Sequence, residues 1–95
     1  MVVRPYEMMV LLHPDVEDYN ASVEEVAEMV RGLGGTISKI DRWGKRRLAY
    51  PVQKKTEGLY AIYSFTLDPV QVKELERITR LKSQVMRHIV VLQEK

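Results

Sequence analysis

Residues 40–52 read Ile40-Asp-Arg-Trp-Gly-Lys-Arg-Arg-Leu-Ala-Tyr-Pro-Val52, and this stretch concentrates the charge of the chain. Residues 39–55 hold seven cationic side chains against one acid, a balance of +6, whereas the whole chain of 95 residues carries only +2. Residues 1–38 have the opposite balance, −5. A cationic band that contains aromatic rings is typical of a surface that meets phosphate. The alternative is a solvated strand edge whose lysines and arginines discourage aggregation between sheets.

The same stretch predicts one long, bent strand. Residues 36–41 and 48–52 both have strand-like patterns, and Gly44 between them allows a bulge or a sharp bend. The polar residues 53–57 predict a hairpin loop that ends at Gly58. Residues 59–67 are rich in aromatic and branched side chains, and they predict the strand that returns from this loop.

A helix is predicted on the N-terminal side of this hairpin. Between about residues 16 and 33, apolar side chains recur every three or four positions, as they do on one stripe of a helix. Asp15 and Ser22 are alternative N-caps, and Gly34 is the candidate left-handed residue that ends the helix. The opposite side of the helix is acidic, with Glu17, Asp18, Glu24, Glu25 and Glu28.

A second helix is predicted on the C-terminal side. Asp68 can cap it, and Pro69 suits the first helical position, where a missing amide hydrogen has no cost. We expect this helix to end near Ser83, with Leu81 or the methylenes of Lys82 in its buried stripe. Strands predicted at the two ends of the chain complete the set of elements.

The predicted order is strand 4–12, helix, strand, strand, helix and strand 85–92, which indicates an α+β fold. It is the order of the ferredoxin-like βαββαβ sandwich, a four-stranded antiparallel sheet with two helices on one face. The first and third strands are expected in the centre. The other face would expose apolar residues such as Met9 and Leu11 unless a partner covers it. A chain of this length is expected to form a single domain, residues 1–95.

Composition and motifs argue against several functions. The chain has no cysteine, its apolar runs are too short to span a bilayer, and no start resembling a secretion signal is seen, so a cytoplasmic protein without a membrane partner is expected. Neither His13 nor His88 has a partner at metal-ligand spacing. No nucleophile elbow or phosphate-binding loop is present. We therefore expect no enzymatic activity, no cofactor and no metal.

RNA binding is better supported by the sequence than catalysis is. The support comes from the basic residues and not from the aromatic ones. An RNA-recognition motif has the same topology, but its basic-Gly-aromatic signature is missing from the third strand, which disfavours stacking of bases on the sheet. The cationic residues suit contacts to the backbone of a folded RNA. The candidate RNA-binding residues are Arg4, Arg42, Lys45, Arg46, Arg47, Lys54, Arg80 and Arg87.

Four short motifs, spread in order over essentially the whole chain, form one pattern. They are Arg4-x-Tyr6-Glu7, Gly44-x-Arg46-Arg47-Leu48-Ala49-Tyr50-Pro51-Val52, Lys54 with Gly58-x-Tyr60, and Val85-Met86-Arg87-His88. Together they resemble the bacterial small-subunit ribosomal protein S6 family. The Arg-Arg-Leu-Ala-Tyr-Pro segment is the specific part of the resemblance.

The resemblance implies a structural constituent of the small ribosomal subunit that is not an enzyme. Such a protein would bind the central domain of small-subunit (16S) rRNA together with ribosomal protein S18, with which it would form a heterodimer. It would be a monomer when isolated and would be located in the ribosome. The residues expected at the partner interface are Trp43, Leu48, Tyr50 and Tyr60. Two other classes remain open: an independent RNA-recognition module, and a ferredoxin-like protein whose open sheet face closes on its own copy.

Overall fold

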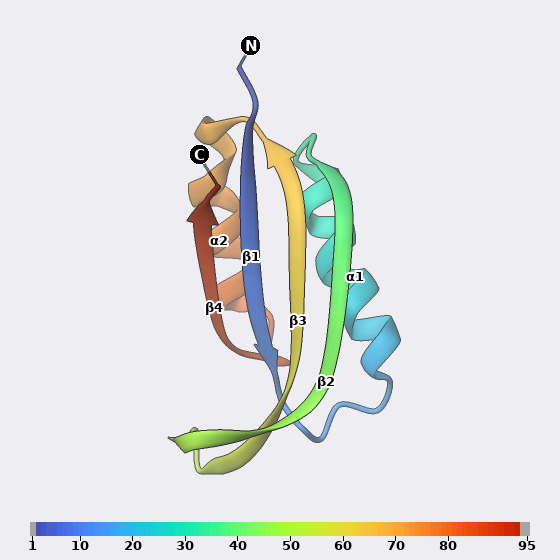
Figure 1. The fold of residues 1–95 in the computed structure, drawn as a ribbon, viewed down its shortest axis with the longest axis vertical. Coiled ribbons are helices and arrows are strands. Elements are labelled where there is room, and N and C mark those ends of the chain that lie inside the picture. The colour runs from blue at the N-terminus through green and yellow to red at the C-terminus, as the bar shows by residue number, and fades with distance from the viewer. Residues whose placement is uncertain (1, 94–95) are drawn as a thin grey trace.

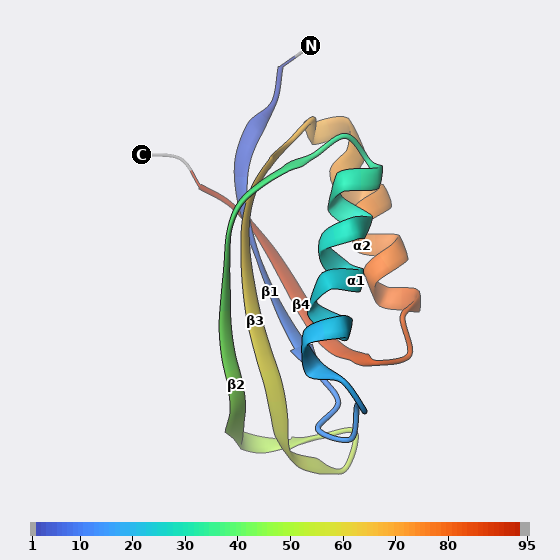
Figure 2. The ribbon, with the colours of Figure 1, turned by 90° about the vertical axis from the view of Figure 1, so that its right-hand side faces the viewer.

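The computed structural model describes residues 2–93, which form one four-stranded sheet and two main helices (Figure 1). The elements are β1 (Arg4–Leu12), α1 (Tyr19–Gly32), β2 (Thr36–Val52), β3 (Lys55–Leu67), the 3-10 turn η1 (Pro69–Gln71), α2 (Val72–Leu81) and β4 (Val85–Leu92). The strand order is β2-β3-β1-β4 with antiparallel neighbours, so β1 and β3 are central as predicted. Both helices cover one face of the sheet (Figure 2), which confirms the ferredoxin-like α+β prediction.

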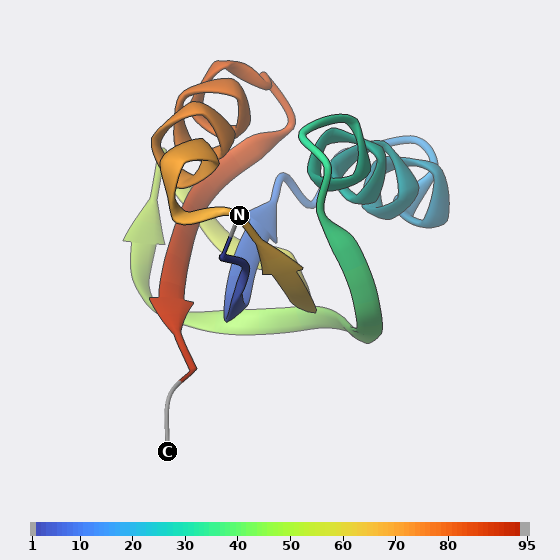
Figure 3. The ribbon, with the colours of Figure 1, turned by 90° about the horizontal axis from the view of Figure 1, so that it is seen from above.

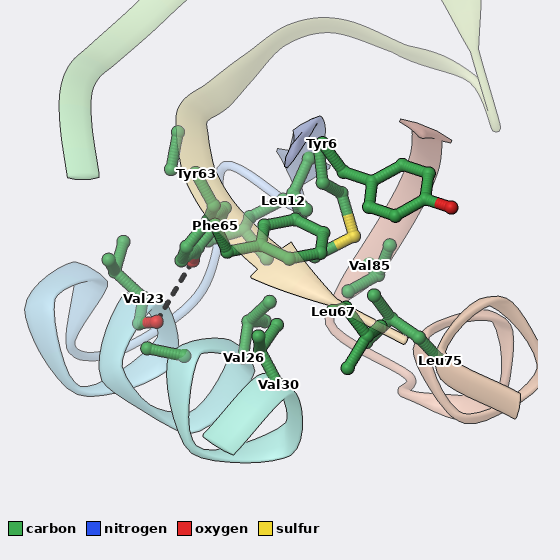
Figure 4. Packing of buried hydrophobic residues seen from close by; sticks show 14 residues of the cluster. Tyr6, Leu12, Val23, Val26, Val30, Tyr63, Phe65, Leu67, Leu75 and Val85 are labelled. Carbon is green, nitrogen blue, oxygen red and sulfur yellow. Dashed lines mark hydrogen bonds between the residues drawn. The ribbon is translucent and has the colours of Figure 1, made fainter. Parts of the chain in front are cut away.

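The main core lies between the sheet and the two helices (Figure 4). Alternate residues of β1 and β3 point into it, as the period of two in a strand requires. Buried side chains from α1 and α2 meet them from the other layer. The fully buried members include Met8, Leu12, Val23, Val26, Val30, Tyr63, Leu67 and Leu75. The Tyr63 hydroxyl donates a 2.9 Å hydrogen bond to the Val23 carbonyl and so joins β3 to α1.

Each helix differs from the prediction in where it begins or ends. Asp18 is the N-cap of α1, because its side chain accepts a 3.0 Å hydrogen bond from the amide of Ala21. The proposed caps Asp15 and Ser22 were therefore wrong. The helix α2 ends at Leu81, earlier than predicted, and the Leu81 side chain is 71% exposed instead of buried. Asp68 caps the 3-10 turn η1 that leads into α2, since it accepts from the amide of Val70 at 3.0 Å, whereas α2 itself has Gln71 at its N-cap position and no side-chain cap.

The hairpin between β2 and β3 is tighter than the sequence predicted. Its turn is only Gln53 and Lys54, with φ of 50° and 64°, and Val52 pairs with Lys55 across it. Two successive left-handed residues are the geometry of a type I′ hairpin turn. The predicted loop over 53–57 was wrong because β3 begins at residue 55, four residues earlier than expected.

β2 is one continuous strand, and its pairing register with β3 shifts at three places. The pairing register shifts between Arg42 and Gly44, where Gly44 has φ of +73°, which confirms the predicted bulge. Two further shifts separate Ile37 from Lys39 and Arg47 from Val52, and residues 48–51 have no partner in the ladder. The proline at position 51 fits there because it has no amide hydrogen to pair.

We call residues 45–57, the distal half of the hairpin, the arm. The arm crosses the sheet on the side away from the helices, as the light green part of β2 shows in Figure 3. It brings Val52 onto Leu11 and Met86, which form a second buried cluster with Leu48 and Tyr60. The expectation that Leu11 is exposed was therefore wrong, because the arm leaves this side chain only 4% exposed.

We predict that Gly44→Ala lowers the free energy of unfolding by about 1–2 kcal/mol, because a β-carbon in the left-handed region meets its own backbone. No other atom would obstruct that carbon, since a Cβ at Gly44 has nothing within 4 Å. Urea unfolding checks this. Gly32→Ala is the matched control, because its Cβ also meets open space but its φ is not positive. Equal stability of the two variants would contradict the explanation by backbone strain.

Candidate functional site

A groove lies between the arm and the open face of the sheet. Its volume is about 240 Å³, and its walls come from β1, β2, β3 and β4. Most of the lining is apolar, and residues 48–50 of the arm form one wall. The lining residues are Met9, Leu11, Leu48, Ala49, Tyr50, Val52, Tyr60, Arg87, His88 and Ile89. Three of the four predicted partner residues therefore meet in one cavity: Leu48, Tyr50 and Tyr60.

The fourth predicted partner residue, Trp43, stands at the root of the arm and is 48% exposed. Its ring centroid lies 6.3 Å from that of Tyr60, and the planes are tilted by 53°. The guanidinium of Arg46 lies over the indole, 5.8 Å from the ring centroid, a distance at which a cation and the ring face attract each other. Trp43 thus connects the apolar groove to the cationic side of the arm.

Arg87 is the fixed charge of the groove. Its guanidinium lies 5.5 Å from the centroid of the Tyr50 ring, and its Nη1 donates a 3.2 Å hydrogen bond to the Tyr50 hydroxyl. Tyr50 comes from the arm and Arg87 from β4, so this contact closes the groove at one side. Within residues 2–93, Arg87 forms no ion pair with a carboxylate.

The remaining cations of the arm face solvent. The arm contains five lysines and arginines and one acid, Glu57, which pairs in register with Arg47. Lys45, Arg46, Arg47 and Lys54 are all exposed. Among the described residues, Arg47 and Lys54 form no ion pair with a carboxylate. The arm therefore carries a net positive charge.

Three of the candidate RNA-binding residues lie away from the arm. Arg42 pairs in register with the core residue Ala61, on the helix side of the sheet, and its guanidinium lies 3.8 Å from Glu24 of α1. Arg80 is in α2, in the layer of helices that covers one face of the sheet. Arg4 begins β1, at the end of the sheet far from the hairpin (Figure 1). Four candidates thus lie on the arm, Lys45, Arg46, Arg47 and Lys54, and Arg87 contacts the arm through Tyr50. Arg4, Arg42 and Arg80 lie elsewhere.

Tyr19 holds the root of the arm, which the sequence did not predict. Its hydroxyl accepts a 3.2 Å hydrogen bond from the amide of Gly44 and donates a short one to the carbonyl of Tyr60. The first residue of α1 is thereby joined to β2 at its bulge and to β3 opposite. Tyr19 falls on the apolar stripe predicted between about residues 16 and 33, but the periodicity of that stripe gives no sign that its hydroxyl bonds to two distant backbone groups.

A second tether lies near the tip of the arm. The Nζ of Lys55 is 2.7 Å from the Asp15 carboxylate, in the loop that follows β1. The hydrogen bond and the charge of Lys55 lower the pKa of Asp15 below its ordinary value. Both groups contact solvent, so the tether orients the arm without a large desolvation cost.

Stacking of bases on β3 is excluded for two of its three aromatic rings, Tyr63 and Phe65, because both are buried. Tyr63 faces the helices, has no exposed surface and donates its hydroxyl to α1, and burial raises its pKa. The ring of Tyr60 lies inside the groove instead of on an open platform. The independent RNA-recognition module is therefore disfavoured.

Metal sites and membrane-spanning helices are both absent from the described part of the chain. Residues 2–93 contain no group of three or more histidine and acidic side chains arranged to hold a metal ion. Neither α1 nor α2 has the length and the apolar character that a membrane crossing requires.

Comparison with known proteins gives one consistent family. A family model described as ribosomal protein S6 matches residues 5–92. Small ribosomal subunit protein bS6 of Clostridium botulinum is 43% identical over 94 residues, which cover 97% of this chain and 100% of that protein. The bS6 of Paenarthrobacter aurescens is also 43% identical, over 97% of this chain and 93% of its own. The crystal structure of 30S ribosomal protein S6 from Thermotoga maritima has a TM-score of 0.90 at 30% identity and covers 97% of this chain and 89% of that one.

We predict that Tyr19→Phe lowers the free energy of unfolding by about 1–2 kcal/mol, because it leaves a backbone amide and a carbonyl without their partner. Chemical denaturation measures the change. Tyr6→Phe is the control, since the Tyr6 ring is also buried but its hydroxyl makes no hydrogen bond within the described chain. A destabilisation of equal size in Tyr6→Phe would show that hydroxyl removal in general, and not the root of the arm, is responsible.

The Asp15–Lys55 pair should make stability depend on pH. Because the folded pKa of Asp15 is lowered, its contribution is fully present above the ordinary aspartate value, about 3.9, and is lost as pH falls through the folded value. The difference in unfolding free energy between wild type and Asp15→Asn is expected to favour wild type at neutral pH and to shrink toward zero in acid. Glu17→Gln, at an exposed residue without an ion pair in the described chain, should show no such trend. A difference that persists at low pH would rule out the ion pair as its cause.

Proposed function

The chain belongs to the ribosomal protein S6 family, and from this premise we propose that it binds the central domain of 16S rRNA together with ribosomal protein S18. Members of this family are structural, non-enzymatic constituents of the small ribosomal subunit. The ribosome is therefore where the chain acts. The RNA and protein contacts that follow are the finer part of the proposal.

One observation carries this proposal: the arm presents a cationic surface and an apolar groove side by side. The arm carries five cations and one acid, Glu57. Four residues of the same arm form a wall of the groove: Leu48, Ala49, Tyr50 and Val52. A purely RNA-binding surface has no need of an apolar cavity. A purely protein-binding surface has no need of so many unneutralised cations. The combination fits a protein that contacts RNA and a partner protein at once.

The RNA side of the proposal uses Lys45, Arg46, Arg47 and Lys54. These side chains lie on one short hairpin and can follow a phosphate backbone without reading its sequence. Cations without a carboxylate partner do not have to break an ion pair to reach phosphate, which favours Arg47 and Lys54 over Arg42. Arg4, Arg42 and Arg80 stand apart from the arm, and any contacts they make would be to other parts of the RNA.

The partner side uses the groove, with Leu48, Tyr50 and Tyr60 in its walls and Trp43 beside it. Apolar surface that remains open in the isolated chain gains stability when a partner removes it from water. Aromatic side chains are common anchors of such interfaces because they bury large areas at low cost in conformational entropy. The heterodimer with ribosomal protein S18 would cover this surface, and the isolated chain would be a monomer.

The charge of α1 orients the molecule. Its exposed acids include Glu24, Glu25 and Glu28, and they lie in the helical layer. Phosphate would be repelled from that layer and attracted to the arm. The bound RNA would therefore approach from the arm side of the molecule.

Filter binding to a central-domain fragment of 16S rRNA, with and without ribosomal protein S18, tests the proposal. We expect tight, salt-sensitive binding that requires both proteins. Arg47→Ala and Arg46→Ala should each reduce the slope of log affinity against log salt by about one unit for every phosphate that the removed side chain neutralised. Arg77→Ala is the control, since Arg77 is exposed on α2 and paired with Glu74 at 2.7 Å.

The outcomes separate the alternatives. Absence of binding with both proteins present would overturn the proposal. An unchanged salt slope in both arm variants would remove these two arginines from the RNA surface. Sedimentation of the isolated chain as a dimer would favour self-association through the open face of the sheet.

A further inference from the structure

The groove has a chemical character that limits what occupies it. Of the ten residues that line it, Arg87 is the one with a permanent charge, and none is acidic. The next cations, Arg46 and Arg47, lie on the arm that forms its outer wall. The groove is therefore an apolar cavity in a positive potential, which favours a ligand that is apolar and carries negative charge.

Arg87 and Tyr50, both exposed, already contact each other in the isolated chain. The Tyr50 ring lies against its guanidinium at 5.5 Å from the centroid, and the Tyr50 hydroxyl accepts a hydrogen bond from Nη1. A guanidinium has five N–H donors, so one such bond leaves a planar pair of donors available. Two parallel N–H groups match the two oxygens of a carboxylate, and a side chain that is already ordered loses little entropy when it binds.

The apolar floor continues beyond the groove along β4. Ile89 and Val91 follow Arg87 on the same face of the strand, and each is 52% exposed. Ile89 pairs in register with Met9 of β1, which also lines the groove. Apolar surface thus runs in one line from the Arg87 end up the open face. A row of this kind fits several consecutive residues of an extended or helical protein segment.

These features distinguish a protein segment from RNA at this position. A phosphate on Arg87 would bring ribose and further charge over an apolar floor, and it would gain nothing from covering Ile89 or Met9. An apolar segment with one carboxylate satisfies both the floor and the charge. We therefore expect Arg87 to bind a carboxylate of a protein, whereas the cations of the arm are expected to contact phosphate.

We propose that the groove binds an apolar segment of the partner protein that carries a carboxylate, and that Arg87, oriented by Tyr50, is the anchor for that carboxylate. This rests on the proposed function, in which the partner is ribosomal protein S18. It assigns Arg87 to the protein interface instead of to the RNA, where the sequence analysis placed it.

Calorimetric titration of the full chain with ribosomal protein S18, in the absence of RNA, tests this assignment. Arg87→Met keeps most of the aliphatic length but removes the charge, and we expect it to weaken the heterodimer at least about tenfold. Arg77→Met makes the same change of charge on α2, away from the groove, and should leave the affinity unchanged. Thermal unfolding of both variants confirms that they are folded.

A double-mutant cycle then identifies the carboxylate. Each acidic residue of ribosomal protein S18 is replaced singly by its amide and is titrated against wild type and against Arg87→Met. One replacement should weaken binding to wild type about tenfold or more and have little further effect on Arg87→Met. If no replacement behaves in this way, the carboxylate anchor is wrong.

The RNA alternative is a defined outcome of the same experiments. With the heterodimer formed at saturating ribosomal protein S18, Arg87→Met should leave the salt slope of RNA binding unchanged, whereas Arg47→Ala should reduce it. An unaltered heterodimer affinity together with a reduced RNA slope in Arg87→Met would show that Arg87 contacts phosphate. If wild type itself does not bind ribosomal protein S18, the proposed function fails before the anchor is tested.

Discussion

The hydroxyl of Tyr19 determines where the arm leaves the sheet. It bonds to the amide of Gly44 and the carbonyl of Tyr60, and so it fixes the bulge of β2 against the first turn of α1. Gly44 supplies the left-handed backbone that the bulge requires. Everything beyond this point, the groove and the cationic surface alike, depends on the direction that the bulge gives to the arm. The helical layer thereby positions a surface on the opposite side of the sheet.

Much of the fold could be predicted from the sequence because local patterns carry it. Alternating and helical periods defined the order of elements, Gly44 indicated the bulge, and Asp68 was recognised as a cap. The tight turn was missed because Gln53 and Lys54 adopt left-handed conformations without the glycine or asparagine that usually signals them. The cap of α1 was missed because Asp15, Asp18 and Ser22 are all suitable residues within one short stretch, and only the three-dimensional path of the loop selects among them.

The candidate site was less predictable for a geometric reason. Counting alternate residues along a strand gives the face of each side chain only while the register is kept. The shifts at Gly44 and at residues 48–51 break that count, so Arg42 lies beside α1 whereas Arg46 lies against Trp43 near the groove. Burial of Leu11 depends on Val52 and Met86, which are far from it in sequence. The density of cationic residues in the sequence identified the hairpin as a candidate site. Which of these cations lie on the same surface depends on the register shifts of the folded strand.

The arm has one backbone and two binding surfaces, and this makes the two ligands thermodynamically linked. A protein seated in the groove would restrict the motion of residues 48–52, and the cations on either side of them would then meet RNA with less conformational entropy left to lose. Linkage is reciprocal, so RNA bound to the same arm would tighten the protein contact by an equal factor. Order of assembly would then matter for rates but not for the final stability of the complex. A short hairpin can in this way couple two neighbours that need not touch each other.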